Sequence, residues 1–159
     1  MSRLMEWVDV CIGNEEDAEK VFGVSAEESD VTRAELSAAG YERVARTLAE
    51  RFKLRTVAVT LLESRSADEN GWSAVLLHDG ELHTSRAYDI QIVDRVGGGD
   101  SFAGGLIYGL LAGKPAQGAL EFAVAASCLK HSVSGDFNLV SAAEVENLVG
   151  GDASGRVQR

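Results

Sequence analysis

The chain has 159 residues, of which 45% are apolar and 25% charged, so it can bury one core, and disorder of the whole chain is excluded. Its 25 acidic and 15 basic residues give a formal charge of -10. This balance argues against a nucleic-acid or membrane partner, because both bind a basic face. The charged first residues do not resemble a signal peptide, and Cys11 and Cys128 lack disulfide or metal spacing. We therefore expect a cytoplasmic protein.

The first part of the chain alternates strand and helix patterns. An apolar run at residues 8–12 predicts a buried strand, and Asn14 is a suitable N-cap for a helix that ends near residue 22. Apolar side chains recur with helical spacing over residues 41–52. Residues 56–62 are apolar and rich in β-branched side chains, which predicts a second strand.

The middle of the chain carries a hairpin pattern. Residues 72–78 and 81–84 flank Asp79-Gly80, a dipeptide that favours a type I′ turn between two antiparallel strands. A further short strand is predicted near residues 90–93. This order of strands and helices is typical of a layered α/β fold.

Three helices are predicted in the last third of the chain. The first follows a glycine run and extends to about residue 111, and the second begins at Lys114-Pro115. The third begins at Ser141, with Glu144 placed to complete a capping box. We interpret residues 1–150 as one unit and residues 151–159 as a flexible tail.

The most informative stretch is Gly97, Gly98 and Gly99, followed by Asp100 and a helix. Consecutive glycines expose backbone N–H groups, and the first turn of a helix attracts anions. No Walker lysine follows, so the stretch is not a P-loop, and it does not have the spacing of a Rossmann dinucleotide loop. Asp100 suits either of two roles, a helix cap or a base that deprotonates a hydroxyl beside a bound phosphate.

Residues 94–100, Asp-Arg-Val-Gly-Gly-Gly-Asp, resemble the carboxy-terminal signature Asp-Thr-x-Gly-Ala-Gly-Asp of the ribokinase (phosphofructokinase-B) family of sugar kinases. Arg95 stands in place of Thr and Gly98 in place of Ala. The form found here is similar to the 2-keto-3-deoxygluconate kinase branch. The resemblance implies that residues 97–99 are an anion hole, that Asp100 is the catalytic base, and that Asp94 orders a monovalent-cation loop.

Further segments resemble the same family in the same order. Asn14 and Asp17 match its N-x-x-E motif, which implies that Asn14 helps to bind nucleotide and that Asp17, in place of Glu, binds Mg²⁺ through water. An N-cap with a first-turn acid is the alternative. Thr60, Ser64 and Arg65 fall where relatives contact nucleotide phosphates, although a solvated loop explains them equally well.

Two positions near the end of the chain complete the set of candidate site residues. Ser127 lies on the helix that backs the adenine pocket in relatives, where ordinary helix packing is the alternative. Asp136 belongs to a Gly-Asp-Phe-Asn run that resembles the 2-keto-3-deoxygluconate kinase branch, which implies contact with a substrate hydroxyl. A turn-forming aspartate is the other reading.

The resemblance implies a three-layer α/β/α fold of the ribokinase type, of which this chain is the carboxy-terminal half. It implies ATP and Mg²⁺ as cofactors, a monovalent cation, and transfer of phosphate to a hydroxyl of 2-keto-3-deoxygluconate. A nucleotide-binding module without catalysis, and a kinase of fructose, ribose or a nucleoside, are the alternatives. Relatives are about twice as long, so we expect a homo-oligomer or pairing with the missing amino-terminal half.

Overall fold

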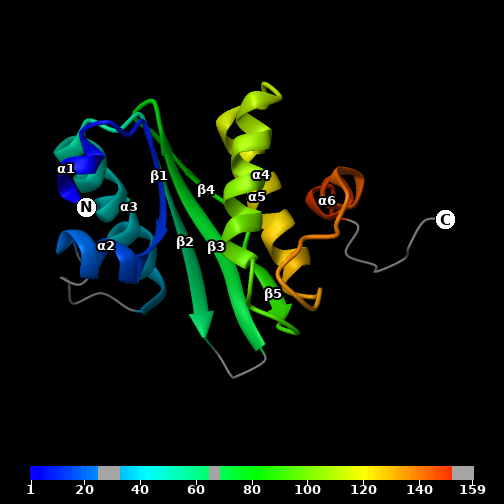
Figure 1. Ribbon diagram of the computed structural model, residues 1–159. Coiled ribbons are helices and arrows are strands. Elements are labelled where there is room, and N and C mark those ends of the chain that lie inside the picture. Colours follow the sequence, from blue (N-terminus) through cyan, green and yellow to red (C-terminus); the bar gives the residue numbers. More distant parts are fainter. Residues whose placement is uncertain (25–32, 65–68, 152–159) are drawn as a thin grey trace.

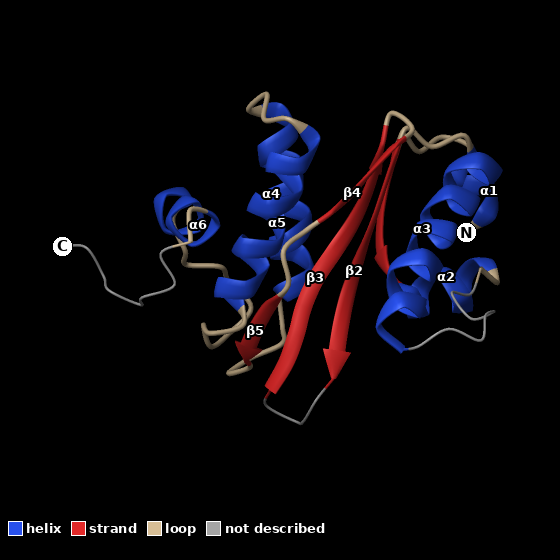
Figure 2. Ribbon diagram, turned by 180° about the vertical axis from the view of Figure 1, so that it is seen from behind, coloured by secondary structure: helices blue, strands red, loops and turns tan. Residues whose placement is uncertain are grey.

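The computed structural model describes residues 1–24, 33–64 and 69–151. Its helices and strands form three layers, with helices on both faces of one mixed sheet (Figures 1 and 2), which confirms the expected α/β/α architecture. The elements are α1 Ser2–Met5, β1 Val10–Asn14, α2 Glu15–Phe22, α3 Arg33–Phe52, β2 Thr56–Ser64, β3 Glu69–His78, β4 Glu81–Thr84, β5 Tyr88–Gln91, α4 Gly98–Leu111, α5 Ala116–Lys130 and α6 Ala142–Val149.

The sheet has the order β1-β2-β3, with β4 and β5 following one another along the outer side of β3. β1 and β2 are parallel, whereas β3 is antiparallel to β2, β4 and β5. β1, β2 and β5 therefore run in one direction, and their carboxyl ends meet at one edge of the sheet. Ligands of open α/β sheets bind beyond this edge, so it is the place to look for a site.

Most boundaries agree with the sequence patterns, and the differences have local causes. β1 begins two residues later than expected, because the amide of Val8 closes the turn after α1 by donating to Met5. β1 is also only half-buried, which corrects the expectation of a buried strand. Asp79 and Gly80 both have positive φ, 49° and 86°, as a type I′ turn requires, so the hairpin prediction is confirmed. Pro115 is the N-cap of α5, just outside its first turn.

Each face of the sheet has its own apolar core. α2 and α3 cover one face through residues such as Val44 and Leu48. α4 and α5 cover the other face, where Phe102 and Leu106 are fully buried. α6 packs on the outer side of α5, through Val145.

α4 and α5 pack unusually closely, and glycines make the approach possible. A Cβ on Gly105 would lie 2.9 Å from the Cα of Ala123, and one on Gly109 would lie 2.8 Å from Ala119. Side chains at these positions would force the helices apart. The beginning of α4 is thereby held against the end of α5, which is the arrangement on which the site depends.

Both cysteines are unpaired and half-buried. Burial raises the pKa of the Cys128 thiol to about 11, and it also raises that of Cys11, with a smaller contribution from the charge of Asp17. Thiols of this kind are poor nucleophiles at neutral pH. In the part of the chain that the structure describes, no helix is both long and apolar enough to cross a membrane.

Candidate active site

The glycine run forms a tight turn that leads into α4. Gly97 has a φ of 79°, in the left-handed region, and is the N-cap of the helix. The amide of Gly98 donates to the carbonyl of Arg95, and the amide of Ser101 donates to that of Gly97. Between them, the amides of Gly99 and Asp100 have no hydrogen-bond partner among the described residues. Two free donors at a helix start can bind an anion.

Asp100 does not cap this helix. It is the third residue of α4, it is exposed, and the helix begins without any side-chain capping bond. The interpretation of Asp100 as a helix cap is therefore wrong. Within the described ranges the Asp100 carboxylate forms no hydrogen bond or ion pair, so it is available to a ligand that occupies the cavity beside it.

That cavity has a volume of about 380 Å³ and lies between α4, α5, α6 and the segment that joins α5 to α6. Its polar end carries Gly97, Asp100 and Asp136, and its wall includes the rings of Tyr108 and Phe122, whose centroids are 5.0 Å apart. The remaining lining residues are Ser101, Gly104, Gly105, Ala126, Phe137, Asn138, Val140, Ala142 and Val145. An apolar wall that ends at Gly97 and Asp100, next to the free amides, suits a ligand with a planar base and phosphates.

The fold brings Asp136 against the glycine turn, although 36 residues separate it from Asp100. A Cβ on Gly97 would lie 2.3 Å from the carbonyl oxygen of Asp136, so the two segments touch. The side chain of Asp136 is exposed and lines the same cavity as Asp100. Two carboxylates from distant parts of the sequence thus face one space.

Asp94 ties the same two segments together. Its carboxylate accepts hydrogen bonds from the amide of Val96, at 3.0 Å, and from the amide of Gly135, at 2.8 Å. These backbone donors hold the pKa of Asp94 below its usual value, and the charge of Lys130 adds to the effect. Asp94 is therefore ionised, and its carboxylate stabilises the loop through these hydrogen bonds. Its role in a cation loop stays a prediction.

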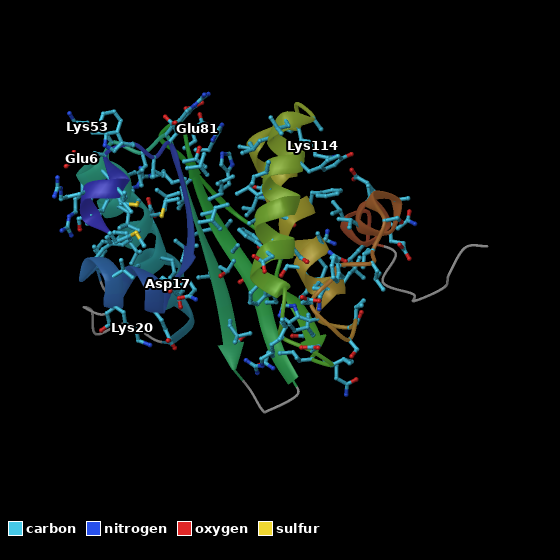
Figure 3. All side chains as sticks on the ribbon, in the orientation of Figure 1. Glu6, Asp17, Lys20, Lys53, Glu81 and Lys114 are labelled. Carbon is cyan, nitrogen blue, oxygen red and sulfur yellow. The ribbon has the colours of Figure 1, made fainter. Side chains whose placement is uncertain are left out.

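Asn14 and Asp17 form a capping box at the start of α2. The side chain of Asn14 accepts from the amide of Asp17 at 2.8 Å, and that of Asp17 accepts from the amide of Asn14 at 3.3 Å. Figure 3 shows Asp17 at the end of the sheet where α4 begins, whereas Glu81 and Lys114 lie at the other end. Neither Asn14 nor Asp17 lines the cavity of Asp100.

The remaining phosphate-loop candidates lie at the end of β2. Thr60 pairs with Asn14 in the sheet, and its hydroxyl donates to the carbonyl of Gly13 at 3.4 Å. Ser64 is the last residue of β2, and Arg65 lies outside the described residues. The structure thus places Thr60 and Ser64 on β2, at the same edge of the sheet as the glycine turn.

Ser127 lies beneath the glycine turn, outside the cavity lining. It is fully buried, and its hydroxyl donates to the carbonyl of Gly98 at 2.8 Å. A direct contact between this hydroxyl and a nucleotide does not fit that geometry. Ser127 instead contacts the residues that carry the free amides.

His131 is a buried neighbour of the same turn. Its Nδ1 lies 2.7 Å from the carbonyl of Ser127, which can only accept, so Nδ1 carries the proton. The ring lies against that of Trp72, with centroids 4.9 Å apart. Burial lowers the pKa of His131, and the charges of Lys130 and Arg95 add to this lowering although the bond to Ser127 opposes it.

We expect stability to fall with acidity because of His131. The pKa of His131 is lower in the folded state than in the unfolded state. Below about pH 6.5 the unfolded chain therefore binds a proton that the folded chain does not bind, and this favours unfolding. The melting temperature should be flat above pH 7 and should decrease from pH 6.5 to pH 5. Circular dichroism at constant ionic strength measures it. A His131→Phe variant that keeps the same slope would contradict this account.

Sequence reasoning missed the aromatic wall and one of the buried residues under the turn. Tyr108, Phe122 and Phe137 come from α4, α5 and the following loop, and they meet only after packing. Lys130 was also missed, although it is fully buried and its ammonium group donates to the carbonyl of Val133 at 3.0 Å. The available signal was helical spacing, because Lys130 and His131 lie three and four residues after Ser127.

Comparison with known sequences gives one family. The profile of the pfkB family carbohydrate kinases matches residues 1–142. A 2-dehydro-3-deoxygalactonokinase of Haloferax volcanii is 36% identical over 111 residues, which are 69% of this chain and 32% of that protein. A 5-dehydro-2-deoxygluconokinase of Bacillus subtilis is 36% identical over 73 residues, which are 44% of this chain and 22% of that protein.

Comparison with solved structures also finds carbohydrate kinases. The 2-dehydro-3-deoxygluconokinase of Thermotoga maritima matches with a TM-score of 0.84 and 48% identity, over 94% of this chain and 44% of that one. Ribokinase of Thermotoga maritima matches with a TM-score of 0.65 and 19% identity, over 94% of this chain and 45% of that one, which shows the fold alone. The chain thus spans less than half the length of each of these relatives.

Proposed function

The chain belongs to the pfkB family of carbohydrate kinases, and from this premise we propose that it carries the phosphoryl-transfer site of an ATP-dependent kinase of 2-keto-3-deoxy sugar acids. The observation that supports this most is the cavity in which Asp100 lies beside the free amides of the glycine turn. Phosphoryl transfer depends mainly on positioning the reactants and on stabilising charge. The cavity can position the reactants, and the free amides can stabilise the charge.

Asp100 is proposed as the base. Its carboxylate takes the proton of the acceptor hydroxyl, whose oxygen then bonds to the γ-phosphorus of ATP. The bond from that phosphorus to the bridging oxygen breaks, and ADP leaves with the electron pair. The amides of Gly99 and Asp100 stabilise the charge that develops on the transferred group.

The nucleotide is proposed to occupy the cavity with its base against Tyr108 and Phe122 and its phosphates toward the glycine turn. Mg²⁺ neutralises phosphate oxygens when it is bound with the nucleotide, and it usually keeps several waters rather than a full protein cage. Among the described residues no group of three or more His, Cys, Asp or Glu side chains is placed to hold a metal. Asp17 fits a water-mediated contact only, because its carboxylate already serves the capping box.

The proposed substrate class is taken from the relatives. The Thermotoga and Haloferax relatives act on the gluconate and galactonate forms of 2-keto-3-deoxy acids, which differ in the configuration of one carbon. We favour 2-keto-3-deoxygluconate, because the identity to the first is 48% and to the second 36%. Asp136 is proposed to contact a substrate hydroxyl, since it faces the cavity beside Asp100.

Turnover of Mg·ATP with either 2-keto-3-deoxy acid tests the proposal. We expect ADP to be released with 2-keto-3-deoxygluconate faster than with its galactonate epimer, and not with ribose or fructose. The chain is assayed alone and combined with the remaining polypeptide of the Thermotoga relative. Calorimetry with ATP distinguishes the alternatives. Binding without turnover in both preparations would indicate a non-catalytic nucleotide module, and absence of binding would refute the proposal.

A further inference from the structure

One face of the last turn of α5 lies directly under the glycine turn. Ser127, Lys130 and His131 are spaced i, i+3 and i+4, so they share this face. All three are buried. The hydroxyl of Ser127 bonds to Gly98, and a Cβ on Gly98 would lie 2.8 Å from the ring of His131.

The contacts of the neighbouring residues hold the turn from both sides. A Cβ on Gly97 would lie 3.2 Å from the Cε of Lys130. The carbonyl of His131 accepts hydrogen bonds from the amides of Val93 and Asp94, at 2.8 and 3.2 Å. The end of α5 therefore anchors the loop before the glycines as well as the glycines themselves.

The bond from Ser127 adds to the helical bonds that hold one amide in its direction. The peptide unit between Gly98 and Gly99 is planar and trans, so its carbonyl and its N–H point in opposite directions. The carbonyl is held toward the buried hydroxyl of Ser127. The N–H of Gly99, which has no partner among the described residues, is thereby directed away from α5. Without the hydroxyl, only the helical hydrogen bond of α4 would hold this glycine-rich unit, so it could tilt more easily.

We infer that Ser127 is a positioning residue for phosphoryl transfer, which acts through the Gly98 carbonyl to aim the Gly99 amide at the transferred phosphoryl group. This inference rests on the proposed function. The contribution of such an amide is largest when charge develops on the transferred group, so a misaligned amide weakens binding of a transition-state mimic more than binding of ADP.

The test compares Ser127→Ala with the parent full chain. Calorimetry measures the affinity for Mg·ADP and for Mg·ADP with aluminium fluoride, which mimics the transferred phosphoryl group. We expect Ser127→Ala to lose about tenfold in affinity for the fluoroaluminate complex and less than about twofold for ADP alone. The ¹⁵N–¹H signal of Gly99 should also shift less on adding the complex.

Two further variants separate positioning from folding. Ser132→Ala removes another hydroxyl that donates to a backbone carbonyl at the same helix end, but one that is exposed and does not contact the glycines. It should match the parent in both affinities. Ser127→Cys keeps a similar volume with a weaker donor and should give an intermediate loss.

The outcomes are distinct. If the parent binds the fluoroaluminate complex and Ser127→Ala binds it equally well, the positioning role is refuted while the proposed function stands. Equal losses for ADP and for the complex, with a lowered melting temperature, would indicate a structural role and would also refute it. If the parent binds neither ligand, the proposed function fails and the positioning role fails with it.

Discussion

Replacement of Asp100 by Asn is expected to lower the turnover number about 10²–10⁴-fold, which is the usual contribution of a general base. Asn keeps the size of the side chain but cannot take the proton of the acceptor hydroxyl. The change removes no hydrogen bond or ion pair among the described residues, so the fold should not be affected. The affinity for ADP should be equal or higher, because a negative charge beside the phosphates is removed.

The measurement is ADP release in whichever preparation of the parent shows turnover, together with calorimetry for ADP. Asp136→Asn is the matched control, because it is the same substitution at the second carboxylate of the cavity. Asp136 is proposed to bind substrate, so its variant should raise the KM for the sugar acid more than it lowers kcat. If Asp136→Asn shows the large loss of kcat and Asp100→Asn does not, the assignment of the base is wrong.

Local chemistry explains which features of the candidate site could be predicted. The glycine turn needs no distant partner to expose the amides of Gly99 and Asp100, and Asn14 with Asp17 forms its capping box within one helical turn. The type I′ turn at Asp79-Gly80 is similarly encoded by two adjacent residues. Each of these features depends on residues that are neighbours in the sequence, so their spacing is sufficient to predict them.

Features that depend on packing could not be predicted in this way. The direction of the Ser127 side chain is fixed by how closely α4 approaches α5, and that approach depends on Gly105 and Gly109 meeting alanines of the other helix. The aromatic wall requires Tyr108 to meet Phe122 across the same interface. The sequence shows two helices that are rich in small and apolar residues at these positions, and only the tertiary contacts distinguish a residue that supports the loop from one that lines the cavity.

Replacement of Gly97 by Ala is expected to be the most destabilising single change in the glycine turn. Gly97 has a φ of 79°, which costs an ordinary L-residue about 1–2 kcal/mol. The added Cβ would also lie 2.3 Å from the backbone oxygen of Asp136. Since a backbone atom cannot rotate away, the loop must move, and overpacking of this kind typically costs about 1–3 kcal/mol. We therefore expect a loss of about 2–4 kcal/mol in the free energy of unfolding.

Gly99→Ala provides the matched control, because it is the same substitution two residues away. A Cβ on Gly99 meets no atom within 4 Å, and Gly99 has no positive φ. Ala also has the higher helix propensity, so Gly99→Ala should equal or exceed the parent in stability. Urea denaturation followed by circular dichroism measures both variants. Similar stabilities would show that the contact between Gly97 and Asp136 does not constrain the turn. A loss in Gly97→Ala larger than the cost of the positive φ, about 1–2 kcal/mol, would instead show that the segment carrying Asp136 is packed tightly against the glycine turn.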